Sequence, residues 1–239
     1  MLQDRCWAAL SVIGEMTTMA ARKKVSHEDL EKEVWYIQDG VSQASIFLDY
    51  NWDSPGRSLI GDINYGREST WGPPDFPLTF RVKRVGNSLR HCFTIFDNFY
   101  ISEEFRAIIE KHEPDVHRYI PVTFHSKTES VQFYILHVLG LVDGVVIDQS
   151  IGNWDDPKIH QNLNEPRFFV ETRDDCLAYS SEKLGQNKMW RDKRYYTSRH
   201  IFITGPLKAD LQALKRHNIK FTRAKVVDVA ITDTTSLLR

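Results

Sequence analysis

The sequence predicts an α+β fold with two similar β-α-β units, in mostly antiparallel or mixed sheets, packed around a buried central helix. Residues 100–107 and 202–209 both show a strand end, a Ser or Thr cap and a helix start, 102 residues apart. The runs Asn51-Trp52-Asp53 and Asn153-Trp154-Asp155 repeat at the same offset. Two unrelated matches at one offset predict an internal duplication. Residues 129–140 are apolar nearly all round, which predicts a buried helix.

The first third of the chain predicts a surface helix, short strands and a long turn-rich segment. Ser26 is a candidate N-cap, and the acidic residues after it suit the first turn of a helix over 26–33. Residues 51–76 are dense in Gly, Pro, Asn, Asp and Ser, which indicates a long loop. The turn signal Gly86-Asn87 joins two of the expected strands into a β-hairpin. The strands are expected at 34–37, 45–50, 78–85 and 91–96.

The remaining elements follow the two predicted units. In the first, a strand ends at Ile101, Ser102 caps a helix that Pro114 terminates, and a strand follows at 119–124. In the second, a strand at 200–203 leads through Thr204 into a helix with Pro206 in its first turn, and then to a strand at 220–229. Between the units we expect strands at 145–148, 167–171 and 176–180, and an irregular basic stretch at 183–196.

Composition excludes several classes of protein. The 239 residues carry a formal net charge of -1, which argues against a general polyanion binder, so no nucleic acid is expected as a partner. The three cysteines form no CxxC pair, which implies neither a disulfide framework nor a zinc knuckle. No apolar run is long enough to cross a bilayer. We therefore expect a cytoplasmic protein with an N-terminal extension at 1–33, a single domain at 34–239 and no membrane partner.

The repeated Asn-Trp-Asp runs are the sharpest local signals. As loops facing a partner, they would present Trp and Asp side chains, and Trp is a favoured residue at protein interfaces. Turn chemistry explains the same Asn, Asp and Pro residues without a partner, and we favour that interpretation. The candidate partner contacts from these runs are Trp52, Asp53, Trp154, Asp155 and Asp156.

The stretch from Lys188 to Arg199 interleaves basic and aromatic residues. Such a pattern can bind nucleic acid, but the rest of the chain offsets the charge and no nucleic-acid-binding motif surrounds it. A solvated loop or an interface with an acidic protein surface fits better. Its candidate partner contacts are Trp190, Arg191 and Arg194.

The sequence contains no catalytic, metal or cofactor signature that we could assign. His91 and Cys92 are adjacent in a strand, so their side chains point to opposite faces and cannot act on each other. His112 and His117 do not share one helical face, and His137 lies within the apolar run. No phosphate loop, GxSxG elbow or HExxH motif is present.

Three segments in series resemble bacterial immunity proteins of polymorphic toxin systems. They are the strand and helix from Tyr100 with the strand from Tyr119, the run from Phe133 to Ser150, and the closing segment from His200 to Val227. The resemblance covers roughly residues 98–228 and implies a protein that binds a cognate toxin, such as a type VI or contact-dependent effector, and blocks it. It transfers no functional residues.

The leading hypothesis is therefore a stoichiometric toxin inhibitor rather than an enzyme. One alternative is a small cytosolic hydrolase whose Asp and His residues the fold brings together. A second alternative is an adaptor or ligand-binding module that uses the Trp-bearing loops. The oligomeric state is open.

Overall fold

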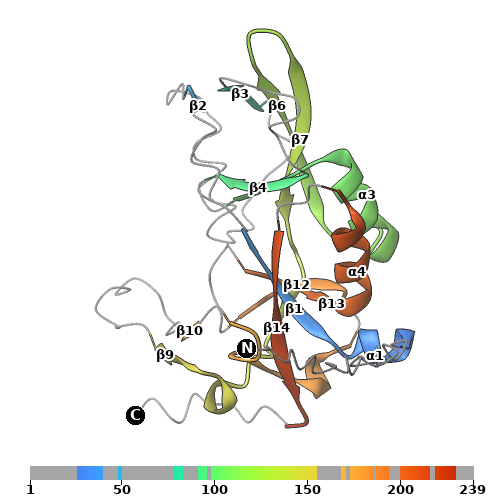
Figure 1. Ribbon diagram of the computed structural model, residues 1–239, viewed down its shortest axis with the longest axis vertical. Coiled ribbons are helices and arrows are strands. Elements are labelled where there is room, and N and C mark those ends of the chain that lie inside the picture. Colours follow the sequence, from blue (N-terminus) through green and yellow to red (C-terminus); the bar gives the residue numbers. More distant parts are fainter. Residues whose placement is uncertain are drawn as a thin grey trace, which may run out of the picture.

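The structure is a computed structural model, and Figure 1 shows its elements. Within the described residues it is an α+β protein with two six-stranded sheets and one two-stranded sheet, which confirms the predicted class. In Figure 1, α3 and α4 lie along one flank of the sheets, while β6 and β7 project at one end. The described residues are 26–39, 48–49, 78–82, 91–95, 98–154, 168–170, 173–185, 187–193, 200–215 and 219–229.

The first six-stranded sheet, here called sheet B, mixes parallel and antiparallel pairs. Its strand β3 pairs in parallel with β6, and the other neighbours are antiparallel. In spatial order it consists of β2 (Leu48–Asp49), β3 (Leu78–Val82), β6 (Arg118–His125), β7 (Ser130–His137), β5 (Asn98–Ile101) and β4 (Cys92–Ile95).

The second six-stranded sheet, here called sheet A, has β1 near its centre, antiparallel to both neighbours. In spatial order it consists of β11 (Ala178–Ser180), β14 (Ile219–Val227), β1 (Val34–Asp39), β13 (Ile201–Thr204), β12 (Met189–Asp192) and β8 (Leu141–Val142). Outside these sheets, β9 (Gly152–Trp154) pairs with β10 (Phe168–Val170), and short 3₁₀ turns occur at Ile147–Gln149 and Ser181–Lys183.

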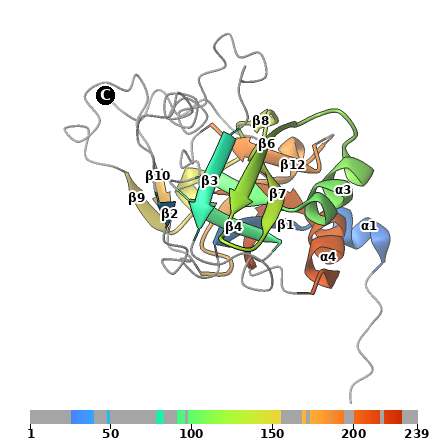
Figure 2. The same ribbon diagram turned by 90° about the horizontal axis from the view of Figure 1, so that it is seen from above.

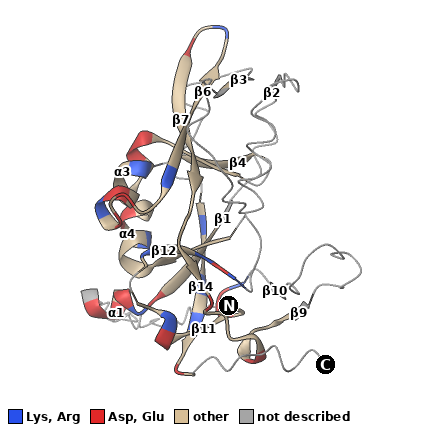
Figure 3. Cartoon of the chain, turned by 180° about the vertical axis from the view of Figure 1, so that it is seen from behind, with Lys and Arg blue, Asp and Glu red and all other residues tan. Residues whose placement is uncertain are grey.

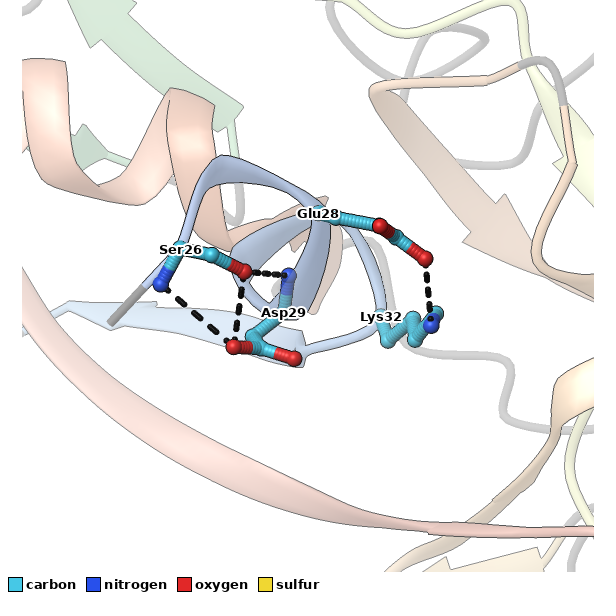
Figure 4. A network of polar contacts seen from close by, with 4 residues as sticks. All are labelled: Ser26, Glu28, Asp29 and Lys32. Atoms are coloured by element: carbon cyan, nitrogen blue, oxygen red, sulfur yellow. Dashed lines mark hydrogen bonds and ion pairs between the residues drawn. The ribbon is translucent and has the colours of Figure 1, made fainter.

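The helices form where the capping residues predict them. In α1 (His27–Glu31), the Ser26 hydroxyl accepts the Asp29 N–H at 3.1 Å, and the Asp29 carboxylate accepts back from Ser26, which is a capping box. A Glu28–Lys32 ion pair at 3.0 Å adds an i,i+4 contact (Figure 4). Together these contacts stabilise a helix of little more than one turn.

Helices α3 (Glu103–His112) and α4 (Gly205–Ala213) cover the same flank. Ser102 caps α3 by accepting the Phe105 N–H at 3.3 Å. Thr204 precedes α4 but makes no side-chain cap, and Pro206 in the first turn supplies the fixed φ instead. A single core lies under both helices and draws on both sheets. Its members include Phe105, Ile109, Leu207 and Leu211 from the helices and Ile37, Ile101, Leu136, Ile201 and Ile203 from the strands.

The predicted buried helix over residues 129–140 is wrong, because this segment is strand β7. It forms a hairpin with β6, in which His125 faces Ser130 across the turn. Strand β7 lies between β5 and β6, and its half from Phe133 to His137 is covered on both faces, whereas Ser130 and Gln132 are exposed. A strand buried on two sides is as apolar all round as a buried helix. The described residues between the two predicted units therefore contain no α-helix.

Three smaller predictions also fail. Strands β3 and β4 do not form the expected hairpin, because they lie on opposite sides of the β6–β7–β5 group in sheet B. Residues 145–148 contribute one isolated bridge, between Val145 and Tyr179, and then a 3₁₀ turn rather than a strand. The stretch expected to be irregular contains β12.

In both sheets, the strands next to the helix connection run in the same relative directions. In sheet B, α3 connects β5 to β6, and β7 lies between these strands and runs antiparallel to both. In sheet A, α4 connects β13 to β14, and β1 occupies the equivalent place. In each sheet, the strand that follows the helix has a parallel outer neighbour, and the strand that precedes the helix has an antiparallel outer neighbour. The internal duplication itself stays a prediction.

Candidate functional site

Most predicted partner contacts lie outside the described residues. Trp52, Asp53, Asp155, Asp156 and Arg194 fall in segments that the structure leaves undescribed. The backbone of Trp154 closes β9 and pairs with Phe168, while nothing is described of its side chain. These residues stay candidates on sequence grounds alone.

Trp190 is a core residue. Its exposed fraction is 2%, and its ring stacks on Phe202 with centroids 6.1 Å apart and lies 5.6 Å from Tyr179. The chain also passes close by at Gly140, where a Cβ would lie 3.3 Å from the Trp190 Cβ. A side chain this buried cannot contact a partner unless the core opens. Burial therefore removes Trp190 from the candidate partner contacts.

Arg191 follows in β12 and is half-buried. Its backbone N–H donates to the Gly140 carbonyl at 2.8 Å and so helps to join β8 to the edge of sheet A. Its guanidinium is one of the charges that lower the pKa of His137. The contacts of Arg191 are thus with the interior, at the junction of the two sheets.

The Glu113 side chain accepts several hydrogen bonds at that junction. It is the C-cap of α3, and its carboxylate is 6% exposed. It accepts the backbone N–H groups of Lys188 at 2.6 Å and Met189 at 2.9 Å, and the His117 Nε2–H at 2.8 Å. Because an ionised carboxylate only accepts, Nε2 of His117 carries the proton. One buried side chain therefore joins α3, which covers sheet B, to β12 of sheet A.

His137 lies at the end of β7, opposite Arg118, and is buried. Burial, followed by the charges of Arg191, Arg118 and His117, lowers the pKa of His137 to about 4. Its ring is therefore neutral at pH 7. No described atom forms a hydrogen bond with its Nε2. This residue cannot serve as a surface acid or base, because solvent does not reach it.

Asp210 contacts a histidine and a lysine across the helix pair, so it is the Asp and His contact to weigh against the hydrolase alternative. It lies 3.0 Å from His112 Nε2 and 2.9 Å from Lys111 Nζ. The hydrogen bonds from Lys111 and then His112 lower the pKa of the Asp210 carboxyl. A carboxylate held ionised between two donors joins α4 to α3 and is a poor general base. We assign this contact to helix packing.

A polar, open surface occurs where β6 and β7 extend beyond α3. Arg106 of α3 lies over the rings of Tyr119 and Tyr134, at 5.0 and 4.8 Å from their centroids. The Glu103 carboxylate is 3.6 Å from Arg106 and, by accepting from the Tyr134 hydroxyl, raises the pKa of Tyr134. Past these residues the same face of the two strands carries Pro121, Thr123, His125, Ser130 and Gln132. Figure 2 shows β3, β6 and β7 together, with α3 to one side.

The charges of the described surface are mixed in sign. Figure 3 shows basic and acidic residues interspersed along α1, α3 and α4. Within the described segments, no set of three or more His, Cys, Asp or Glu residues could hold a metal ion. Of the helices that the structure describes, none is both long and apolar enough to cross a bilayer.

The model of an immunity protein family, Imm11, matches residues 39–226. The match contains both helix-and-strand units and begins at the last residue of β1, so most of that central strand precedes it. No curated protein matched the chain.

Proposed function

Because this chain belongs to the Imm11 immunity protein family, we propose that it binds a cognate bacterial toxin and neutralises it by forming a direct one-to-one complex. The family match over residues 39–226 is the observation that carries the proposal. The toxin would be an effector of a polymorphic system, delivered by a type VI or contact-dependent route. The chain would act in the cytoplasm, where it meets the incoming toxin.

The described architecture supports a binding role. One hydrophobic core runs beneath both helices and both sheets, and the buried Glu113 ties α3 to β12. A scaffold held in this way loses little conformational entropy when a partner docks on it. Neither the buried His137 nor the helix-packing Asp210 supports the hydrolase alternative.

Co-expression tests the proposal. The protein encoded by the gene immediately upstream is expressed alone and together with this chain in a susceptible host. We expect growth arrest from the first and rescue by the second, with a one-to-one complex on size-exclusion chromatography. A chain carrying Leu207→Asp in the core should not rescue, whereas Glu182→Gln on the surface should. A folded wild-type chain that neither rescues nor co-elutes would refute the proposal.

A further inference from the structure

We propose that residues 26–39 are a strap that closes the body of the protein, by supplying the central strand of the second helix-and-strand unit from the opposite end of the chain. This segment, here called the strap, contains α1 and β1, and all of it except Asp39 precedes the family match. The inference concerns how the chain folds. It goes beyond the proposed function and does not depend on it.

Five strands of each sheet have the same arrangement. Their spatial orders are β3-β6-β7-β5-β4 in sheet B and β11-β14-β1-β13-β12 in sheet A. In both orders the first pair is parallel and the other three pairs are antiparallel. In both, a helix connects the two strands that flank the central one. Strand β1 of sheet A therefore corresponds to β7 of sheet B.

The central strand has a different place in the chain in the two sheets. Strands β3, β4, β5 and β6 follow one another along the chain, and β11, β12, β13 and β14 follow in the equivalent order. Strand β7 comes directly after β6, through the turn at 126–129, whereas β1 comes before all the other strands. In Figure 1 the blue β1 accordingly lies beside the red β14 from the other end of the chain. This is the order of a circularly permuted copy, in which the closing strand has moved from the end to the start.

Strand β1 is buried on both faces of sheet A. Val34, Tyr36 and Ile37 are at most 1% exposed. Ile37 belongs to the core beneath the helices, and Val34 and Tyr36 belong to the second core cluster, because alternate side chains of a strand point to opposite faces. The backbone of β1 pairs with β13 from Val34 to Ile37 and with β14 from Val34 to Asp39. Without the strap, two strand edges and two core clusters would be open to solvent.

Helix α1 fastens the start of the strap to the same late part of the chain. The Leu30 carbonyl lies so close to Gly205, at the start of α4, that a side-chain Cβ there would contact it. Glu31 forms an ion pair of 2.7 Å with Lys188, next to β12. The elements that hold the strap, β13, α4 and β14, are the last three of the described chain. Because synthesis proceeds from the N-terminus, the strap can pair only when the chain is nearly complete.

A circular permutant tests whether β1 is the equivalent of β7. The chain is opened between Val41 and Ser42 and its original ends are joined, so that β1 follows β14 as β7 follows β6. Residues 230–239 and 1–25 form the connection, and at up to about 3.3 Å per residue they can reach between neighbouring strands. We expect the permutant to keep the circular dichroism spectrum of the wild type and to unfold in one transition, with its melting temperature shifted by less than about 10 °C.

The matched control is a permutant opened between Thr204 and Gly205 and joined in the same way. Both residues are buried, so this opening places two charged chain ends inside the protein, and the control should not fold. If the control folds and the permutant opened after Val41 does not, β1 is not the equivalent of β7 and the proposal is overturned.

Hydrogen exchange of the wild-type chain is a second measurement that needs no redesigned protein. A strap that closes the body predicts that the amides of β1 exchange as slowly as those of β7, about a thousandfold or more slower than in an unfolded chain. Exchange of the β1 amides at close to the unfolded rate, while β7 stays protected, would overturn the proposal. Neither measurement involves the toxin, so a strap confirmed in a chain that binds no toxin would refute the proposed function alone.

Discussion

Replacing Glu113 by Ala should destabilise the protein by about 3–5 kcal/mol, because it removes the shared partner of a buried network. The carboxylate accepts three hydrogen bonds, two of them from the backbone of Lys188 and of Met189, where β12 begins. Each donor left buried without a partner costs about 1–3 kcal/mol, and release of a desolvated charge offsets part of the total. The loss would be a large share of the roughly 5–15 kcal/mol that holds a typical domain folded.

Urea unfolding followed by tryptophan fluorescence measures this loss, since Trp190 is buried in the core of sheet A. Glu113→Gln keeps the shape and one acceptor oxygen, so it should cost less than Glu113→Ala. The exposed Glu182→Ala is the matched control and should stay within about 0.5 kcal/mol of the wild type. If Glu113→Ala loses no more stability than Glu182→Ala, the inferred role of Glu113 in holding the two sheets together is wrong.

Three further predictions concern stability. The folded pKa of His137, about 4, lies below its unfolded value of about 6.5, so stability is lost as pH falls from 6.5 to 4. The loss should reach at most about 3 kcal/mol, and His137→Gln should flatten this part of a pH series of urea titrations. Gly205→Ala should cost about 1–3 kcal/mol in thermal unfolding because its Cβ meets the Leu30 carbonyl, while Gly185→Ala, which meets nothing within 4 Å, should be neutral. Arg106→Gln should cost about 1 kcal/mol by removing the cation over Tyr119 and Tyr134, and an equal loss from Lys127→Gln at the exposed turn would contradict this.

Capping and helix-stop residues in the sequence predicted the positions of the helices. The Ser26 and Ser102 caps and the stop before Pro114 place α1 and α3 close to their observed bounds. The strand-to-helix junction before Pro206 places the start of α4, whereas its end, expected near His217, is at Ala213. In each case the residues that define the element are its immediate neighbours in sequence, so no knowledge of the tertiary structure was needed.

The sequence did not reveal in the same way which distant segments pair as strands. Strand β7 looks like a buried helix because its half from Phe133 to His137 is covered on both faces, although its length and its β-branched and aromatic residues are typical of a strand. Strands β3 and β4 are close in sequence, yet β5, β6 and β7 lie between them. Their placement depends on a helix and three further strands that come later in the chain.

The candidate site also depends on contacts between residues that lie far apart in the sequence. Trp190 stands in a basic stretch that suggested a surface, and only its stacking on Phe202 reveals a core position. Glu113 reads as an ordinary charged residue at a helix end, and its role depends on backbone donors 75 and 76 residues away.

Toxin neutralisation by direct binding is tested most directly by titrating the purified chain into the active upstream gene product and following the toxin's activity. Activity should fall in proportion to the added chain and vanish at a one-to-one ratio, with a stable complex at the end point. Full toxin activity in the presence of an excess of folded chain would contradict the proposed function.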